Sequence, residues 1–462
     1  MLKLHDTATG TIKPLTLRRN DEVSMYVCGP TVYGPPHLGH GRFALSFDVL
    51  RRYIEFKGLR VIHVSNITDI DDKIIQRAGV ENVDCATIAS TYEKTWWESM
   101  DKLGILRPTY VPHAVSYVEA MVNLIVKLFD LDVAYELSDG IYLDVSKVSD
   151  YGLLAHQDLA SLKSGARVEI DENKRSPLDF VLWKLAKPGE PRWPSPFGNG
   201  RPGWHTECVV MSLDLLGDGF DIHGGAQDLI FPHHENERAQ AVALNRVFAS
   251  HWVHNGWVTV SGEKMSKSLG NYTNLEELLN SHDSRAYRLL VLRSHYRSPI
   301  EVTKETLSEA DIAIKRLDRC GKRFNLQNDC SPRLNDAMSS NSCDIAELKK
   351  FEDAMDDDLD TARAVAQIFD LINKANLAKD NSDDSKAELF ASSALLFANA
   401  LGLESKTESD AIDSYSESLR LQREEARKNK KFDEADRLRA ELEELGWIVE
   451  DSKDGKHVNH DY

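Results

Sequence analysis

The sequence contains no apolar run that approaches the roughly 20 residues needed to cross a membrane. Its first residues, Met1 to Asp6, lack the hydrophobic region of a signal peptide. Cysteine is also sparse, because the six cysteines among 462 residues are widely separated and include no Cys-x-x-Cys pair. A compact disulfide framework is therefore excluded, and we expect a cytoplasmic protein in a reducing environment.

Positive charge is in short supply, since 56 Lys and Arg residues face 74 Asp and Glu residues for a net charge of −18. This balance argues against non-specific binding of nucleic acid by the whole surface, so any such contact must come from local basic patches. Two helical patterns carry them: Lys315, Arg316, Arg319, Lys322 and Arg323, then Arg420, Arg423, Arg427, Lys428, Lys430 and Lys431. Each is compatible with RNA binding and equally with an exposed helix face of paired charges.

What is present in the first half is an alternation of strands and helices. Apolar runs at Met25–Cys28 and Arg60–Val64 predict strands, and the intervening 40–56 pattern predicts a helix. Helical patterns follow at 83–104 and 113–132. This order predicts an α/β fold with a Rossmann-type, doubly wound parallel sheet. Acidic and hydroxyl residues in Asn66–Lys73 lie where such sheets bind ligands, although Thr68 or Asp69 could simply cap a helix.

Composition changes divide the rest of the chain. Residues 133–200, rich in Gly, Ser and Pro with short strand-like pieces, predict a connective insertion, and the sheet resumes over 201–262 with one strand at His251–Val260. From about 272 the pattern is nearly all helical. We therefore expect these domains: 1–132 with 201–262, the insertion 133–200, a loop region 263–300, a helical bundle 301–403, and a small domain 404–462.

The stretch Tyr26–Arg42 organises the fold around a strand, a Gly/Pro turn and a helix. Such an order places a helix N-terminus over the end of a sheet, where backbone N–H groups and the macrodipole favour an anion. His37 and His40 lie in that first turn and can donate to a phosphate, and Gly39 lets a ligand approach the backbone. Two surface histidines in a turn would give the same local pattern.

A second stretch, Lys264-Met-Ser-Lys-Ser268, forms a short cationic loop before a helix. Lys264, Ser266, Lys267 and Ser268 could close on a polyphosphate and neutralise the charge of a leaving pyrophosphate. Together, His37-Leu-Gly-His40 and Lys264–Ser268 resemble the HIGH and KMSKS signatures of class I aminoacyl-tRNA synthetases, with Leu in place of the usual Ile.

A possible metal constellation is spread over the first half of the chain. Cys28 ends the first strand, Cys208 begins a helix, and His233 and Glu237 are four residues apart on one helix face. If the sheet brings them together, these four residues could bind zinc. Each alone has an ordinary explanation as a buried cysteine or a surface pair. His234 is the alternative ligand if His233 is not used.

Four strings resemble the cysteinyl-tRNA synthetase family: Cys28-Gly-Pro-Thr-Val-Tyr33, Asn66-Ile-Thr-Asp-Ile-Asp-Asp-Lys-Ile-Ile75, Pro202-Gly-Trp-His-Thr-Glu-Cys208 and Phe231-Pro-His-His-Glu-Asn-Glu237. The resemblance covers nearly the whole chain. It implies one zinc per chain on Cys28, Cys208, His233 and Glu237, and ATP with Mg²⁺ as substrate. It also implies an amino-acid pocket lined by Thr31, Thr68, Trp204 and Asp228.

The same resemblance implies a reaction. His37 and His40 would stabilise the α-phosphate while Lys264 and Lys267 hold the β- and γ-phosphates, giving cysteinyl-adenylate and then cysteinyl-tRNA. Residues 272–400 would contact the tRNA stem and 405–462 the anticodon, and we expect a monomer. Three features depart from the family: Pro36, the pair Ala226-Gln227 in a usually all-glycine run, and the tail His457–Tyr462, which lacks a basic, aromatic ending.

Zinc would explain how cysteine is chosen over serine, which differs by one atom. A pocket that recognises shape alone separates such near-isosteres by only ~10–200-fold. Zinc prefers a thiolate to a hydroxyl and acidifies a coordinated thiol. We therefore expect no editing domain, for which the 133–200 insertion is too short.

Two rival functions remain open at this point. The first is the mycothiol-pathway ligase, which attaches cysteine to an amino sugar and lacks an anticodon-binding tail. The second is a catalytically silent, zinc-stabilised tRNA-binding paralogue. The basic helical pair at 414–445 speaks against the first, and the intact His37, His40, Lys264 and Lys267 speak against the second.

Overall fold

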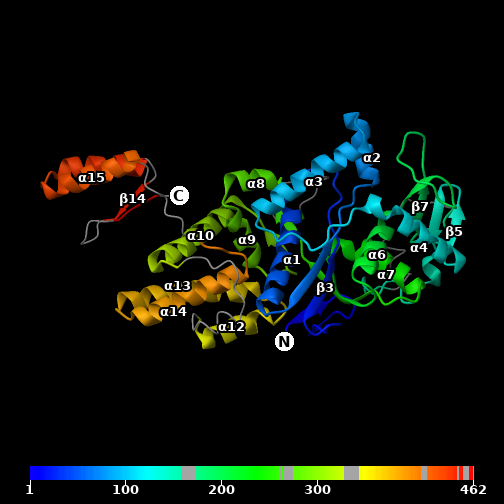
Figure 1. The fold of residues 1–462 in the computed structure, drawn as a ribbon, viewed down its shortest axis with the longest axis horizontal. Coiled ribbons are helices and arrows are strands. Elements are labelled where there is room, and N and C mark those ends of the chain that lie inside the picture. Colours follow the sequence, from blue (N-terminus) through cyan, green and yellow to red (C-terminus); the bar gives the residue numbers. More distant parts are fainter. Residues whose placement is uncertain are drawn as a thin grey trace.

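The computed structural model describes residues 1–157, 173–260, 263–264, 274–326, 343–406, 414–444, 447–450 and 457–460. Its central element is a four-stranded, all-parallel sheet in the order β10-β9-β3-β4 (Figure 1). The strands are β3 (Glu22–Val27), β4 (Arg60–Ser65), β9 (Phe220–Ala226) and β10 (Ala249–Asn255). The chain moves from β3 outward to β4 and later to β9 on the other side, so the strand order reverses beside β3.

Strand β3 is buried along its whole length, and its side chains alternate between two apolar cores. Met25 and Val27 belong to the core that continues into α1 and the helical half of the chain. Tyr26 and Cys28 belong to the core shared with α6 and the insertion. This alternation turns the sulfur of Cys28 toward α6, and so sets the position of the site described below.

Helices cover the sheet on both faces, as a parallel sheet requires. In chain order they are α1 (Leu38–Phe56), α2 (Asp72–Glu81), α3 (Cys85–Lys102), a 3₁₀ turn (Ala114–Tyr117), α4 (Val118–Asp130), α6 (Trp204–Leu215) and α7 (Glu235–Ala243). The N-terminal hairpin of β1 (Lys3–Asp6) and β2 (Thr11–Pro14) attaches at the β10 edge, where the Thr7 amide donates to the Trp252 carbonyl over 2.9 Å.

Two expected details are wrong. Neither Thr68 nor Asp69 caps the next helix; Asp71 does, because its side chain accepts the Lys73 amide at the start of α2, a helix the sequence pattern did not predict. The expected strand His251–Val260 is two strands, β10 and β11 (Val258–Val260). Gly256 interrupts it, where a Cβ would lie 2.4 Å from the carbonyl oxygen of Arg297.

The expected insertion contains an antiparallel sheet in the order β5-β6-β7-β8. Its strands are β5 (Ala134–Leu137), β6 (Gly140–Leu143), β7 (Phe180–Leu185) and β8 (Gly200–Pro202), and a 3₁₀ turn (Val145–Lys147) follows β6. It is joined to the central part by Asp72 at the start of α2, whose carboxylate pairs with Lys184 of β7 and Arg201 of β8, each over 2.5 Å.

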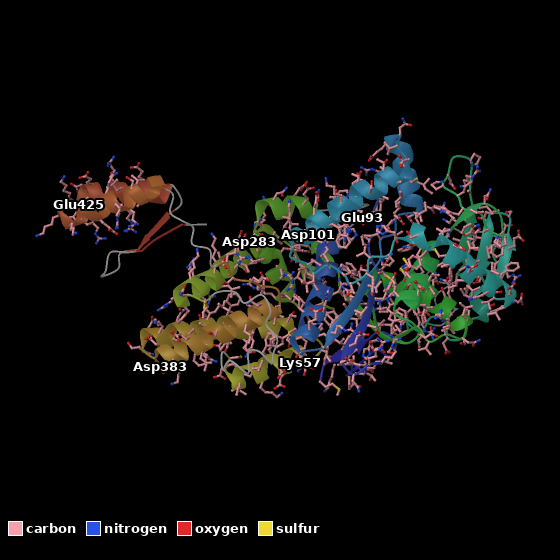
Figure 2. The ribbon with its side chains drawn as sticks, in the orientation of Figure 1. Lys57, Glu93, Asp101, Asp283, Asp383 and Glu425 are labelled. Carbon is pink, nitrogen blue, oxygen red and sulfur yellow. The ribbon has the colours of Figure 1, made fainter. Side chains whose placement is uncertain are left out.

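Beyond the sheet the described chain is almost entirely helical. A small sheet, β12-β11-β13, with β12 (Glu263–Lys264) and β13 (Ile300–Glu301), comes first. The helices are α8 (Leu275–Ser281), α9 (Ser284–Leu292), α10 (Lys304–Phe324), α12 (Ile345–Met355), α13 (Thr361–Asp380) and α14 (Asp384–Ala400). At the end of α1, Lys57 pairs with Glu352 of α12 over 2.5 Å (Figure 2).

The C-terminal elements are α15 (Ser414–Lys428), α16 (Phe432–Glu444), β14 (Trp447–Glu450) and β15 (His457–His460). The sequence predicted the helical pair at 414–445, and the structure adds β14 and β15, which pair antiparallel with each other. These elements stand at one end of the molecule, where Figure 2 labels Glu425. Within the described ranges, no helix combines the length and apolarity that a membrane span requires.

A fully buried ion pair joins the two halves. Arg288 of α9 donates to Asp48 of α1 over 2.5 Å, to the Leu103 carbonyl over 2.9 Å and to the Leu401 carbonyl over 3.3 Å. Burial alone would raise the pKa of Asp48, but the guanidinium groups of Arg288 and Arg52 hold that pKa below its ordinary value. The helical half is therefore anchored to α1 through a charge that cannot be solvated.

We expect Arg288→Met to lower the free energy of unfolding by about 3–5 kcal/mol, because Asp48 would stay buried without its main counter-charge. Chemical denaturation followed by circular dichroism measures the change. Arg107→Met serves as the control, since Arg107 pairs with Asp101 at the surface (Figure 2) and should cost about 0–1 kcal/mol. Equal stability of the two variants would contradict the anchoring role of Arg288.

Candidate active site and metal centre

The candidate site lies at the carboxyl ends of β3 and β9, beside the point where the strand order reverses, which is where open α/β sheets bind ligands. Cys28 follows β3, and its amide donates to the Gly224 carbonyl of β9 over 3.1 Å. Gly29 is required next, because a Cβ there would lie 1.7 Å from the Asn66 carbonyl oxygen. The side-chain oxygen of Asn66 accepts the Gly29 amide over 2.8 Å and so holds this turn against the end of β4.

Four buried donors meet in this place: the sulfurs of Cys28 and Cys208, a ring nitrogen of His233 and a carboxylate oxygen of Glu237. Cys208 lies in the second turn of α6, and Glu237 lies in the first turn of α7, after the turn Ile230–His234 that carries His233. The atoms are separated by 3.6 Å (Cys28 Sγ–Cys208 Sγ), 3.4 Å (Cys28 Sγ–Glu237 Oε1), 3.8 Å (Cys208 Sγ–His233 Nε2) and 2.9 Å (His233 Nε2–Glu237 Oε1).

These separations lie within about 0.4 Å of the edges of a zinc tetrahedron. Zinc bonds of about 2.3 Å to sulfur and 2.0 Å to nitrogen or oxygen imply edges of about 3.8 Å between sulfurs, 3.5 Å for mixed pairs and 3.3 Å otherwise. A second grouping, Cys28, His223, His234 and Glu237, also converges. In that grouping His223 Nε2 and Glu237 Oε2 are only 2.6 Å apart, and Nδ1 of His234 lies 2.8 Å from His254 Nε2. The set with His233 offers two sulfur donors where this grouping offers one, so it suits a thiophilic cation such as zinc better.

Neighbouring side chains orient the donors. His223 engages the second oxygen of Glu237, which leaves Oε1 directed at the cysteines. His205 Nδ1 lies 2.9 Å from His233 Nδ1, so the other ring nitrogen of His233, Nε2, faces Cys208 and Glu237. The Trp204 ring stacks on His233 with 3.9 Å between ring centres. Such partners commonly set the orientation of metal ligands. The sequence analysis did not assign His205 or His223, because only the folded chain brings them beside His233 and Glu237.

The electrostatics of the cluster favour negative donors. Burial raises the pKa of the Cys28 thiol, and nearby Cys208 and Glu237 raise it further. Burial also opposes ionisation of Cys208, but the hydrogen bond from Cys28 and the proximity of His233 lower the pKa of Cys208 to about 6. For Glu237, burial is outweighed by His223 and His233, which hold its pKa well below the ordinary value. The pocket therefore stabilises a thiolate and a carboxylate side by side.

Of the four expected pocket residues, Trp204 contacts the cluster and Thr68 contacts Glu207, the neighbour of Cys208. Thr31 and Thr68 pair as an isolated bridge, and the Thr68 hydroxyl donates to Glu207 Oε2 over 2.7 Å. Trp204 is 37% exposed while stacked on His233. Asp228 is exposed on the 3₁₀ turn Gln227–Leu229 that follows β9. Glu207, which the sequence analysis did not assign, is fully buried, and this burial raises its pKa well above the ordinary value.

Ala226 and Gln227, which depart from the family's usual glycines, stand at positions with room for a side chain. Gly224 and Gly225 are retained, and there a Cβ would lie 2.3 Å from the Phe47 ring and 2.5 Å from the His234 ring. Ala226 ends β9 half-buried, and Gln227 is exposed. The two positions with no room for a side chain therefore keep glycine.

The His37–His40 turn forms the start of α1. His37 is the N-cap and accepts the His40 amide on Nδ1 over 3.3 Å, and His40 Nδ1 accepts the His37 amide over the same distance. The two rings stack with 3.7 Å between centres. Both histidines and Gly39 between them are half-buried. Two imidazoles at a helix N-terminus give a site suited to an anion.

The segment that follows the lysine loop returns to the same turn. Lys264 ends β12, which pairs with β11 at Thr259. Ser266, Lys267 and Ser268 lie outside the described residues. After the loop, the Leu275 amide donates to the Pro36 carbonyl over 3.1 Å, and Asn274 pairs with His37 as an isolated bridge. The chain that follows the loop is therefore fixed beside His37, although more than 230 residues separate the two stretches.

Arg42, two residues after His40, holds the segments next to β11 and β13. Its buried guanidinium donates to the carbonyls of Trp257, Tyr296 and Ser298, which flank β11 and β13. Burial lowers the pKa of Arg42 to about 10, so the group remains charged at neutral pH. One side chain of α1 thus fixes the strand from which the lysine loop departs.

We expect Arg42→Met to accelerate amide hydrogen exchange at 256–260 and 296–301 by about 10–100-fold, because hydrogen bonds from a charged donor contribute about 1.5–3 kcal/mol. Hydrogen exchange read by mass spectrometry tests this. Arg18→Met is the matched control: Arg18 donates to the carbonyls of Leu216 and Asp218, so only that turn should loosen. Unchanged protection at 256–260 in Arg42→Met would refute the clamp.

Comparisons with known proteins are consistent along the whole chain. Residues 14–312 match the model of the class I (C) tRNA synthetase catalytic domain, 350–405 the DALR domain, and 418–458 the cysteinyl-tRNA ligase anticodon binding domain. Proteins named cysteine–tRNA ligase are 43% identical over 459 residues in Thermotoga maritima and 41% over 461 in Carboxydothermus hydrogenoformans. Each alignment covers 98% of this chain and 99% of the relative.

Solved structures share the fold at low identity. A Mycobacterium tuberculosis methionyl-tRNA synthetase in complex with methionyl-adenylate aligns with TM-score 0.57 and 15% identity over 83% of this chain and 90% of its own. The Agrobacterium radiobacter K84 agnB2 LeuRS in a ternary complex aligns with TM-score 0.60 and 12% identity over 84% of each chain. These likenesses confirm the expected fold class, a parallel α/β sheet followed by a helical half.

Proposed function

The chain belongs to the cysteinyl-tRNA synthetases of class I, and we propose that it joins cysteine and ATP into cysteinyl-adenylate and then transfers the cysteine to the 3′ end of its tRNA. The observation that carries the proposal is the cluster of Cys28, Cys208, His233 and Glu237 at the reversal point of the sheet. Its separations fit a thiophilic cation, and a cation of that kind is suited to recognising a thiol substrate.

We propose that these four residues hold one zinc ion per chain. When bound, zinc supplies a position that accepts a substrate thiolate in preference to a hydroxyl. The chain itself supplies the orientation: His223 and His205 set the directions of Glu237 and His233. Thr31, Thr68, Trp204 and Asp228 are proposed to complete the cysteine pocket. Trp204 carries its exposed ring over His233 and can shield the substrate from water.

For the nucleotide, we propose that His37 and His40, with Gly39, bind the phosphates at the N-terminus of α1. Each histidine uses its Nδ1 to accept the other's backbone amide. An arriving α-phosphate would take over these amides as donors and gain the positive end of the helix dipole. Lys264 and Lys267, with Ser266 and Ser268, are proposed to neutralise the β- and γ-phosphates together with Mg²⁺. The return of Leu275 to Pro36 supports a shared site.

Transfer RNA is the proposed acceptor. The match of 418–458 to an anticodon binding domain favours it over an amino sugar. The basic patch on α10 gives limited support, because Arg316 and Arg323 donate to Asn373 and Asp380 of α13. In the second patch Arg420 donates to Glu424, its neighbour one turn along. We propose that tRNA contacts lie over 272–400 and 405–462, with the chain acting as a monomer.

Cysteine-dependent ATP–pyrophosphate exchange tests the activity directly. We expect exchange with cysteine, and with serine at no more than about 0.1% of that rate, because binding of the thiolate by zinc should discriminate beyond the ~10–200-fold that shape alone provides. Purified chain is assayed without tRNA, and aminoacylation of tRNA then identifies the acceptor. Absence of exchange in a folded, tRNA-binding sample would instead favour a binding protein without catalysis.

Metal analysis of the purified chain tests the zinc proposal independently of activity. We expect about one zinc per chain, and less than about one fifth of that in Cys208→Ala, since three donors bind zinc far more weakly than four. Cys85→Ala is the control, because Cys85 starts α3, outside the cluster. A Cys208→Ala protein with a full zinc complement would overturn the ligand assignment. His234→Ala distinguishes the alternative ligand set.

A further inference from the structure

A hollow of about 380 Å³ lies beside the candidate site and is not used by the proposed binding of ATP or cysteine. It is lined by Tyr33, from the turn after β3, and by residues of α2: Lys73, Gln76, Arg77, Val80 and Glu81. In Figure 1, α2 stands at the upper edge of the molecule, between α3 and the inserted sheet. The lining thus combines an aromatic ring, an amide, two cations and one acid, and that acid, Glu81, pairs with Arg77.

The lining has the chemistry of a single-strand nucleic-acid site. Lys73 Nζ lies 5.1 Å from the centre of the Tyr33 ring, with its ammonium over the ring face. Arg77 lies over the Tyr92 ring at 5.3 Å and donates to the Tyr92 hydroxyl over 2.6 Å. Proteins that bind single strands combine aromatic faces for bases with cations for phosphates. Lys73 is exposed and its long stem can swing toward a phosphate while a base takes the ring.

The residues that line the hollow stand on turns that are fixed by hydrogen bonds and ion pairs. The Tyr33 amide donates to the Thr31 carbonyl over 3.1 Å, and the Val32 amide to the Thr68 carbonyl over 3.2 Å. On the other side, Asp71 caps α2, and Asp72 is tied to the insertion by Lys184 and Arg201. Tyr33 and Lys73 therefore stand on two turns anchored next to the metal cluster. A preformed site of this kind loses little entropy on binding.

Its position identifies the occupant. Tyr33 follows Cys28 by five residues and precedes His37 by four, so the hollow borders the segment that joins the metal cluster to the phosphate turn. The third proposed substrate, tRNA, must bring its terminal ribose to that place. This ribose lies at the end of an unpaired strand. On the basis of the proposed function, we propose that this hollow receives an unpaired 3′-terminal nucleotide of tRNA, its base stacked on Tyr33 and its phosphate paired with Lys73.

Two variants test the site, each with a conservative partner. Tyr33→Leu removes the ring but keeps an apolar contact, and Tyr33→Phe keeps both. Lys73→Gln removes the charge, and Lys73→Arg keeps it. Lys94→Gln on α3 is the matched control, since Lys94 is exposed, does not line the hollow and is 3.8 Å from Glu98.

Stacking contributes about 1–3 kcal/mol per base, so we expect Tyr33→Leu to raise the KM for tRNA by about 5–150-fold. Lys73→Gln should raise it by about 5-fold and reduce the salt dependence of tRNA binding by about 0.7 in log–log slope, the value for one single-strand phosphate. Pyrophosphate exchange without tRNA should stay within about twofold for both. Tyr33→Phe, Lys73→Arg and Lys94→Gln should retain transfer.

Direct binding of an acceptor-stem minihelix, with and without its unpaired 3′ end, separates the inference from the proposed function. The intact chain should prefer the tailed form by about 5-fold or more, and Tyr33→Leu should lose this preference. An equal preference in both proteins overturns the inference even if exchange is active. A raised KM for ATP in Lys73→Gln would instead assign the hollow to the nucleotide. If pyrophosphate exchange is absent while the preference for the tailed minihelix remains, only the proposed catalysis is overturned.

Discussion

The site depends on one electrostatic constraint: four ionisable donors are buried together at the end of β3. Taking a thiolate and a carboxylate out of water is costly unless a positive partner compensates. In the protein alone the imidazole of His233 supplies that compensation, since burial opposes its protonation but Glu237 and Cys208 raise its pKa to about 10. A divalent cation would satisfy the same two anions with a larger charge. The surrounding features follow from this need, including the close turn at Gly29 and the contact of His223 with Glu237.

A second dependence concerns how two distant stretches share one substrate. The turn at His37 is connected to the segments on either side of the loop after Lys264, by the backbone contact of Leu275 with Pro36 and by the Arg42 guanidinium. Tyr287 of α9 adds a third connection, because its hydroxyl donates to the Leu38 carbonyl over 2.6 Å. The first turn of α1 is thus held by the segment that follows the loop, and the middle of α1 is held by Arg288 through Asp48. A movement of the helical half would therefore be transmitted to the start of α1.

Periodicity predicted the parallel sheet, α1 and the helical half, since long apolar patterns report burial directly. It failed where a single contact decides, as at Gly256, which divides one expected strand, and at Asp71, which caps α2 in place of Thr68 or Asp69. The four proposed metal ligands came from the family resemblance, because no local spacing links Cys28 to Cys208. The orienting residues His205 and His223 could not be found in this way. Their importance arises only from packing against His233 and Glu237.

The charge distribution shows how an acidic chain can present a place for a polyanion. A net charge of −18 repels RNA at long range, although at physiological salt this repulsion is screened beyond about 8 Å. What matters near a contact is therefore the local balance of charge. The acidic residue next to Lys73 on α2 is Asp72, and Lys184 and Arg201 neutralise its charge. Burial would raise the pKa of Asp72, but these two cations outweigh burial and hold that pKa below its ordinary value. Glu81 is likewise engaged by Arg77. Pairing these two acids internally reduces the negative charge near the Lys73 ammonium that an approaching phosphate would meet.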